Sequence, residues 1–339
     1  MISRIADHCF WFGRYLERTE STARVLHVTG NLALDADLAP NDLWKPVLTV
    51  AGEEARFFQI MGDDASALGE GVQHSMSLHA DNPVSILQSA SRARENARAI
   101  RDVVSLEVWH TVNELYLWLA GKTPAPAPGS GPESYAEALF KENRYGFYRA
   151  VRQHAELAQG LLMSTMLHDT PLDFIVLGIY LERAIQTART LDMHHYMRMS
   201  LPAPHQVIET ALSLSLLRAC SGFEPFMKRR QGRVTDEAVA AFLVLEPRFP
   251  RSVRFCVRAA SDRLEGILSP GSASSPGAMA HLRLRFLEDW LDNPPADALK
   301  PDAVHGTLLR IIADTAMVCG LISNDLLGET APASQSQQA

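Results

Sequence analysis

The 339-residue sequence lacks the cysteine patterns that mark metal-binding and redox proteins. Its four cysteines are Cys9, Cys220, Cys256 and Cys319, and no two of them lie within five residues of each other. This spacing excludes a zinc knuckle and a CxxC redox motif. Scattered single cysteines are typical of reduced core residues in a cytosolic protein.

Long hydrophobic runs are also missing. The longest uninterrupted apolar stretch, 238–245, has eight residues, whereas a membrane-spanning helix needs about 20. The first residues carry the charges of Arg4 and Asp7 and contain no apolar signal-peptide core. We therefore expect a cytoplasmic protein that has no membrane partner.

Lysine is scarce, since only five of the 32 basic residues are Lys and the rest are Arg. With 39 acidic residues the net charge is −7, and a mildly acidic chain is not expected to bind nucleic acid. The excess of Arg fits a GC-rich genome. It also fits the use of guanidinium groups as rigid forks for carboxylate and phosphate.

Signals for strands and for common catalytic sites are absent as well. The sequence contains no Asn-Gly or Asp-Gly hairpin between alternating runs, no Walker A loop, no strand-linked GxGxxG and no GxSxG. It has one E-x-x-H, from Glu107 to His110, whereas a di-iron bundle needs two. We expect neither a metal site nor a cofactor.

Helical spacing dominates what remains. Apolar residues recur from Ser3 to about Leu34 at the period of a helix. The pair Asn82-Pro83 is a helix start signal, and the run that it opens continues to Gly121 with a break predicted near Ser105. Further helices are predicted over 133–167, 172–199, 205–221, 235–245, 251–268, 278–292 and 302–327. The sequence therefore predicts an all-α bundle of about ten helices.

Two segments are predicted to lie outside the helices. Residues 123–132 read TPAPAPGSGP, which is a Pro/Gly/Ser linker, and the polar segment 329–339 is predicted to be a disordered tail. The linker separates an N-terminal helical half, 1–122, from a C-terminal half, 133–328. We expect the two halves to form one integrated domain.

An internal repeat supports this division. Residues 13–24 read GRYLERTESTAR and residues 178–189 read GIYLERAIQTAR, with eight identities in twelve positions. Both copies lie in long predicted helices. The simplest interpretation is a bundle built from two related halves, that is, a pseudo-repeat.

On a helix, the repeat aligns a glycine, a glutamate and an arginine on one face. These are Gly13, Glu17 and Arg24 in the first copy, and Gly178, Glu182 and Arg189 in the second. A glycine there allows a neighbouring helix or a ligand to approach closely. The Glu and Arg are two turns apart, beyond the usual i,i+4 contact, so we expect each to pair outside its own helix. Arg18 and Arg183 lie on a different face.

This pattern has two interpretations. The Glu and Arg side chains can form interhelical ion pairs that fix the register of the two halves. Alternatively, they line a polar cavity at the centre of the molecule.

Two other segments contain candidate binding residues. Glu95 and Arg98 share a helix face, where they form either an exposed ion-pair ladder or part of the polar centre. Pro250, Arg251 and Ser252 precede a predicted helix, so they serve as a structural entry or hold an anion at its N-terminus.

As a set, four segments resemble the bacterial alpha-E proteins, in order along nearly the whole chain. They are SRIADHCFWFGRYLERTESTARVL (3–26), RARENARAIRDVVSLEVWHTVNELY (92–116), LGIYLERAIQTARTLD (177–192) and FLVLEPRFPRSVRFCV (242–257). The opening departs mildly from the family pattern at His8 and Cys9. The family pattern falls on Glu17, Arg18, Arg24, Glu95, Arg98, Glu182, Arg183, Arg189, Pro250, Arg251 and Ser252.

The resemblance implies an all-helical domain whose genes accompany, or are fused to, those of circularly permuted ATP-grasp proteins and transglutaminase-like peptidases. That company suggests a system that makes, modifies or cleaves amide bonds in peptides. A possible ATP-grasp-type ligase, a transglutaminase-like protein and a peptide or anionic small molecule are therefore the partners to expect.

Three functions fit these observations. The first is a binding or accessory component that holds a ligase or its anionic substrate through the Glu/Arg centre. The second is an enzyme in which Glu17 or Glu182 is the general base and Arg24, Arg189 or Arg98 stabilises an anionic intermediate. The third is a purely structural helical protein.

Overall fold

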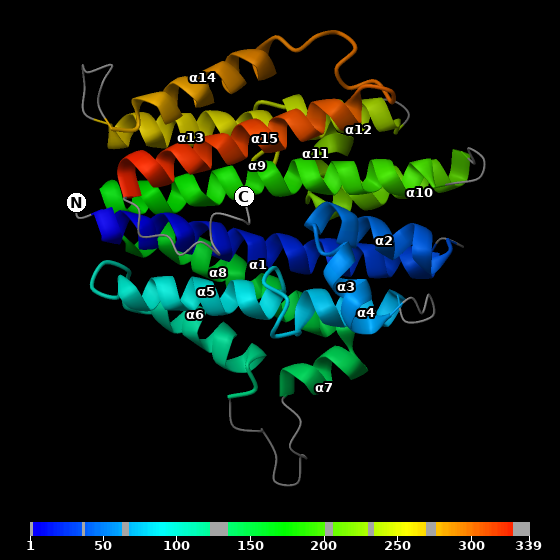
Figure 1. Ribbon diagram of the computed structural model, residues 1–339, viewed down its shortest axis with the longest axis horizontal. Coiled ribbons are helices and arrows are strands. Elements are labelled where there is room, and N and C mark those ends of the chain that lie inside the picture. The colour runs from blue at the N-terminus through cyan, green and yellow to red at the C-terminus, as the bar shows by residue number, and fades with distance from the viewer. Residues whose placement is uncertain are drawn as a thin grey trace. The chain divides into compact units, whose positions relative to one another are not determined.

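The computed structural model describes residues 3–35, 38–62, 68–122, 135–200, 206–229, 234–268 and 276–327. This part of the chain forms fifteen α-helices and one π-helical turn and contains no strand, which confirms the all-α prediction (Figure 1). The predicted linker, 123–132, and the predicted tail, 329–339, lie outside the described residues.

The helices are more numerous than the ten predicted, because capping side chains divide the long helical runs. Ser105 accepts a hydrogen bond from the backbone N–H of Val108 and opens a new helix there, at the predicted break. Asn143 divides 133–167 in the same way. The prediction of a helix start at Asn82-Pro83 was wrong, since that helix begins at Ile86 after the cap Ser85. Three short helices within 40–77 were not predicted.

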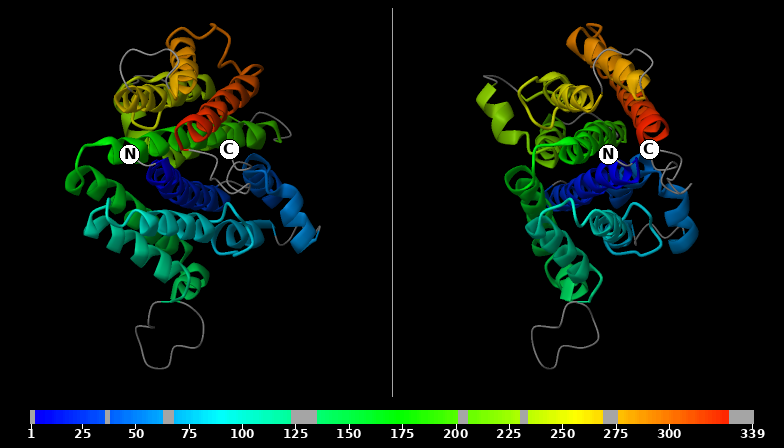
Figure 2. Two further views of the ribbon diagram at one scale, coloured as in Figure 1. Left: turned by 60° about the vertical axis from the view of Figure 1, so that its left-hand side comes forward. Right: turned by 90° about the vertical axis from the view of Figure 1, so that its left-hand side faces the viewer.

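The chain divides into two compact units, and three helices run from one unit into the other. The first unit comprises residues 1–27 and 73–179. In it α5 packs on α6, and α6 packs on both α7 and α8 (Figures 1 and 2). Its helices, including those that it shares, are α1 (Ser3–Asp35), α4 (Leu68–Ser77), α5 (Ile86–Ala99), α6 (Leu106–Leu119), α7 (Tyr135–Glu142), α8 (Arg144–Thr165) and α9 (Thr170–Met199).

The second unit comprises residues 28–72 and 180–339. In it α13 packs on α12 and α14, and α14 packs on α15 (Figure 1). Besides the ends of α1, α4 and α9, its helices are α2 (Pro40–Ala51), α3 (Glu54–Met61), α10 (Gln206–Ala219), α11 (Phe223–Arg229), α12 (Asp236–Leu245), α13 (Val253–Ile267), α14 (Ala278–Asp292) and α15 (Val304–Ile322), which is followed by η2 (Ser323–Leu327).

Helix α1 is buried along most of its length. The apolar residues predicted to face the core are buried, with Phe12, Ala23 and Leu26 fully so. The polar positions between them are buried too, and so α1 has no solvent face over its middle turns. Polar side chains on such a helix must find partners inside the protein.

Within the first unit, α1 and the start of α9 meet backbone to backbone at the two repeat glycines. A Cβ atom on Gly13 would overlap the carbonyl oxygen of Ile175 and lie 3.1 Å from the nitrogen of Ile179. A Cβ atom on Gly178 would overlap the carbonyl oxygen of Phe10 and lie 3.2 Å from the nitrogen of Arg14. The predicted close approach at these glycines is therefore confirmed, and the approaching element is the other repeat helix.

All four cysteines are buried thiols, as predicted, and burial raises the pKa of the Cys9 thiol to about 12.

One helical stretch of the described residues, Val304–Leu327, is long and apolar enough to cross a membrane, and one third of its most apolar 18-residue segment is buried. A single stretch of this kind is weak evidence for a span, because core helices of soluble proteins share its composition.

Candidate functional site

The first repeat copy places a group of charged side chains inside the protein. Glu17 and Glu20 are fully buried on α1, Arg18 is 3% exposed and Arg24 is 6% exposed. Burying four charges on one helix costs several kcal/mol per charge unless each is paired or hydrogen-bonded. Their contacts therefore define what this region does.

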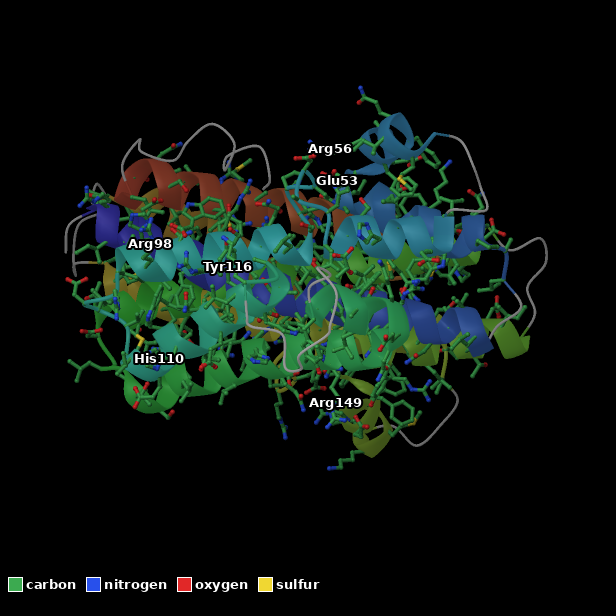
Figure 3. The ribbon with its side chains drawn as sticks, turned by 90° about the horizontal axis from the view of Figure 1, so that it is seen from below. Glu53, Arg56, Arg98, His110, Tyr116 and Arg149 are labelled. Atoms are coloured by element: carbon green, nitrogen blue, oxygen red, sulfur yellow. The ribbon has the colours of Figure 1, made fainter. Side chains whose placement is uncertain are left out.

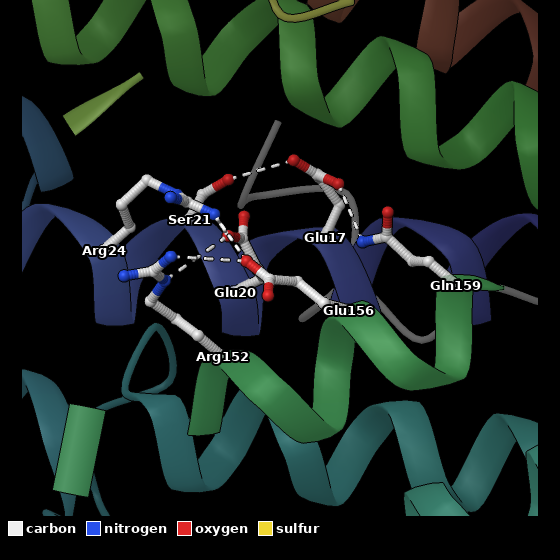
Figure 4. Close-up of polar contacts among 7 residues, drawn as sticks. All are labelled: Glu17, Glu20, Ser21, Arg24, Arg152, Glu156 and Gln159. Carbon is white, nitrogen blue, oxygen red and sulfur yellow. Dashed lines mark hydrogen bonds and ion pairs between the residues drawn. The ribbon is translucent and has the colours of Figure 1, made fainter. Parts of the chain in front are cut away.

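The carboxylate of Glu17 accepts hydrogen bonds from α1 and from α8. The hydroxyl of Ser21 donates to Oε1 at 3.1 Å, and the side-chain amide of Gln159 on α8 donates to Oε2 at 3.0 Å (Figure 4). The contact with Gln159 confirms the prediction that Glu17 pairs outside its own helix.

Arg24 bridges two carboxylates that differ in exposure. Its guanidinium pairs with Glu20 one turn earlier on α1 and with Glu156 of α8, where the nitrogen–oxygen distance is 2.8 Å (Figure 4). Arg152 of α8 reaches the same carboxylates, at 4.0 Å from Glu20 and 3.4 Å from Glu156. The side chain of Glu156 is 45% exposed, whereas that of Glu20 is fully buried. We call these side chains, together with Glu17 and its partner Gln159, the Arg24 cluster. The cluster extends from the core to the surface of α8.

These guanidiniums also act on the adjacent His27. Burial, followed by the positive charges of Arg152 and Arg24, lowers the pKa of its imidazole. The ring stacks against Tyr148 and meets Tyr145 edge-on at 4.9 Å between centroids. The imidazole of His27 is therefore uncharged at pH 7 and packs beside the cluster as an aromatic ring.

In each repeat copy, the arginine that directly follows the glutamate lies over the ring of the tyrosine three residues before it. The guanidinium carbon of Arg18 is 5.5 Å from the centre of the Tyr15 ring, and that of Arg183 is 5.5 Å from the centre of the Tyr180 ring. Arg92 of α5 also donates a hydrogen bond to the Tyr15 hydroxyl at 3.2 Å. Both pairs have the geometry of a cation–π contact.

The second copy repeats one more feature of the first. Glu182 is fully buried, and its Oε1 accepts a hydrogen bond from Gln186, four residues later, at 2.8 Å. Ser21 stands in the same relation to Glu17. Positions 20 and 185 differ, since the first copy has a glutamate where the second has isoleucine. Arg189 is half-buried on α9.

The loop before α13 is tied to the second copy. The Thr187 hydroxyl donates to the carbonyl oxygen of Arg251 at 2.9 Å. The Ser252 hydroxyl is fully buried, donates to the carbonyl oxygen of Glu246 and caps α13 by accepting from the N–H of Phe255. The structure therefore uses Ser252 as a cap and joins Arg251 to α9, while Pro250 accepts a weak hydrogen bond from the Cys256 thiol.

Glu95 and Arg98 lie apart from these buried pairs. Both are exposed on α5, where Figure 3 labels Arg98, and their side chains pair at 2.7 Å. Glu95 also pairs with Arg94, whose guanidinium lies 4.8 Å from the centre of the Tyr116 ring. This is the geometry of the exposed ladder that the sequence suggested as one alternative.

Four residues of the cluster were not predicted from the sequence. Glu20 lies between the repeat positions, and Arg152, Glu156 and Gln159 lie on α8, which carries no copy of the repeat. A signal for three of them exists, because Glu20 precedes Arg24, and Arg152 precedes Glu156, by four residues. That is the spacing of facing side chains on a helix.

The predicted absence of a metal site was based on the lone E-x-x-H. In the described part of the chain no three His, Cys, Asp or Glu side chains are grouped to hold a metal ion. His110 is exposed on α6 and is labelled in Figure 3. His194 lies five residues before the end of α9 and is 6% exposed.

His194 should make the protein less stable in mild acid. Burial lowers its pKa from 6.5 to about 3, so between these values the unfolded chain binds a proton that the folded chain does not. Stability then falls as the pH drops below 6.5, by about 1.4 kcal/mol per pH unit for this residue. We expect His194→Phe to remove this slope in urea unfolding between about pH 7 and about pH 5. The exposed-site control His110→Phe should retain it, and equal slopes in all three proteins would contradict the assignment.

The comparisons with known proteins agree with the two Glu-Arg pairs. A family model named Alpha-E, described as a predicted alpha-helical domain with a conserved ER motif, matches residues 1–327. The chain belongs to the Alpha-E family. Its Glu-Arg pairs are Glu17-Arg18 and Glu182-Arg183, one in each repeat copy.

The relatives found among curated proteins have no described activity. Uncharacterized proteins of Mycobacterium bovis and Mycobacterium tuberculosis are each 22% identical over 332 residues. The match covers 92% of this Alpha-E chain but 36% of the length of either relative. No solved structure matches the chain.

Proposed function

We propose that this Alpha-E protein is a binding component of a peptide amide-bond-forming system, and that it holds an ATP-grasp-type ligase or the anionic substrate of that ligase. One observation carries the proposal. Arg24 and Arg152 both form ion pairs with Glu156, a half-exposed carboxylate at the surface, and both also lie near the buried carboxylate of Glu20. A carboxylate or phosphate from outside has the charge and shape to replace Glu156.

The same geometry gives less support to catalysis by the repeat glutamates. A general base must reach a proton of the substrate. Glu17 and Glu182 are fully buried, and both oxygens of Glu17 already accept hydrogen bonds from Ser21 and Gln159. Buried glutamates of this kind suit a scaffold that fixes the register of the helices, while the guanidinium groups of Arg24 and Arg152 remain for a ligand.

We also propose that the chain consists of two related halves, 1–122 and 133–328. Three parallels support this. The repeat glycines contact equivalent residues of the opposite helix, the Tyr–Arg distances are equal, and each repeat glutamate accepts from a side chain four residues later. The cluster proposed to bind the ligand takes Glu20 and Arg24 from the first half and Arg152 and Glu156 from the second.

The exchange of Glu156 can be tested by calorimetry with two probes, inorganic phosphate and the dipeptide Glu-Glu. Arg152→Met should weaken binding about tenfold or more, because it removes a charged donor. Glu156→Gln should strengthen binding, because it removes the competing carboxylate. Glu137→Gln on α7 is the matched control and should change nothing, because the Glu137 side chain is 41% exposed, against 45% for Glu156, and also pairs with a basic residue, Lys141.

The partner arm uses co-purification with an ATP-grasp-type ligase from the same organism. The proposal expects the ligase to be retained by the wild-type chain and lost from Arg152→Met. It fails if the ligase is not retained and neither probe distinguishes Arg152→Met from Glu137→Gln.

A further inference from the structure

The second unit contains a small cavity that no part of the proposed function uses. Its volume is about 50 Å³, and it lies among α9, α10, α12 and the chain that leads into α15. That volume exceeds the ~30 Å³ share of one water molecule and is well below the ~150 Å³ cavity that holds benzene. It therefore suits a branched aliphatic group of a few carbons.

The wall of the cavity is mainly aliphatic. Leu191 of α9, Leu212 and Leu216 of α10, Ala240 of α12 and Val304 of α15 all line it. All five are buried. An apolar group that enters from water gains the free energy of burial against these side chains.

One polar atom interrupts this wall. His194 lines the cavity, and its Nδ1 has no hydrogen-bond partner among the described residues. The side chain is 6% exposed, so solvent does not readily satisfy it. A buried polar atom without a partner is costly and needs an explanation, and a ligand that bonds to it would supply one.

Charges of both signs lie beside the aliphatic wall. Arg198 pairs with Asp236 through its Nε atom, at a rather long 3.4 Å. The other oxygen of Asp236 accepts the Ser213 hydroxyl, which fixes that carboxylate. Glu237 is exposed and also lines the cavity, so it marks the mouth. The two outer nitrogens of Arg198 are suited to a carboxylate and Glu237 to an ammonium or amide N–H.

We propose that this cavity binds an α-amino acid with a short branched aliphatic side chain, free or at the C-terminus of a peptide. The carboxylate lies on Arg198 and also accepts a hydrogen bond from Nδ1 of His194, one helical turn earlier on α9. The nitrogen faces Glu237, and the side chain enters the leucine wall. The inference rests on residues separate from the Arg24 cluster, so either can fail without the other.

Calorimetry on the full chain with four probes tests this chemistry. L-leucine and the tripeptide Ala-Ala-Leu separate a free amino acid from a peptide end, and binding of either supports the proposal. Leucine amide lacks the carboxylate, and glycine lacks the side chain, so both should bind about tenfold or more weakly. The proposal is overturned if leucine and Ala-Ala-Leu both fail to bind at about 10 mM, or if leucine amide binds equally well.

Two variants locate the site. Arg198→Met should weaken binding of the active probe about tenfold or more, and Ala240→Leu, which fills the cavity, should abolish it. Arg254→Met is the matched control, because Arg254 also pairs with one carboxylate, Asp292, and its side chain is 27% exposed against 24% for Arg198. Equal affinity in Arg198→Met, or a folded Ala240→Leu that still binds, would place the ligand elsewhere and refute the assignment.

Discussion

Gly13→Ala is expected to lower the free energy of unfolding by about 3 kcal/mol. The added Cβ would overlap the carbonyl oxygen of Ile175 and lie 2.9 Å from its carbonyl carbon. These are backbone atoms of helix α9, so they cannot move aside as the end of a flexible side chain can. Helices α1 and α9 would have to separate, and the buried contacts around the crossing would loosen.

Gly178→Ala should have a similar effect, because its Cβ meets the backbone of Phe10 and Arg14 in the same way. The matched control is Gly160→Ala on α8, where a Cβ meets nothing within 4 Å. Alanine is the better helix former, so this variant should stabilise the protein by up to about 1 kcal/mol. Urea unfolding followed by circular dichroism measures all three, and a Gly13→Ala protein as stable as Gly160→Ala would refute the close helix approach.

This contact shows how far the sequence predicts the fold. The glycine-to-glutamate spacing predicted a close approach, and the repeat predicted that both helices have it. The sequence could not tell whether a helix or a ligand approaches, because spacing on one helix does not identify what lies against it. The structure supplies that answer in the backbone of Ile175 and Phe10.

The short helices show the complementary limit. The described residues between 40 and 77 form three helices of 8 to 12 residues. Helices this short are marginal by themselves in water and depend on tertiary packing. Trp44 and Phe57, both buried, provide that packing, but the period of so short an apolar pattern is hard to recognise in sequence.

The sequence predicted the residues of the candidate site on α1 but not their partners on α8. The repeat identified Glu17, Arg18 and Arg24, which are buried together on α1. Their partners on α8 are far away along the chain. Glu156 is 132 residues from Arg24, and Gln159 is 142 residues from Glu17. A single sequence carries no information on such a pairing, because the helix that supplies the partners has no repeat of its own.

Arg24→Met is expected to have the largest effect of any single change, a loss of about 3–5 kcal/mol in the free energy of unfolding. Glu20 is fully buried and pairs directly with Arg24, whereas the nitrogen of Arg152 lies 4.0 Å from its carboxylate. A buried carboxylate that loses its nearest cation keeps its desolvation cost without the compensating attraction. The same substitution also removes a partner of Glu156.

Two further variants separate this explanation from a simple loss of packing. Arg98→Met removes an equally simple ion pair, with Glu95 at 2.7 Å, from a site where both side chains are about half exposed or more. It should cost less than about 1 kcal/mol, because exposed pairs contribute little. Arg24→Met combined with Glu20→Leu removes both buried charges and should recover much of the loss. If the double variant is no more stable than Arg24→Met, the buried charge of Glu20 is not the cause. If Arg24→Met costs no more than Arg98→Met, the Arg24 cluster does not hold α1 against α8.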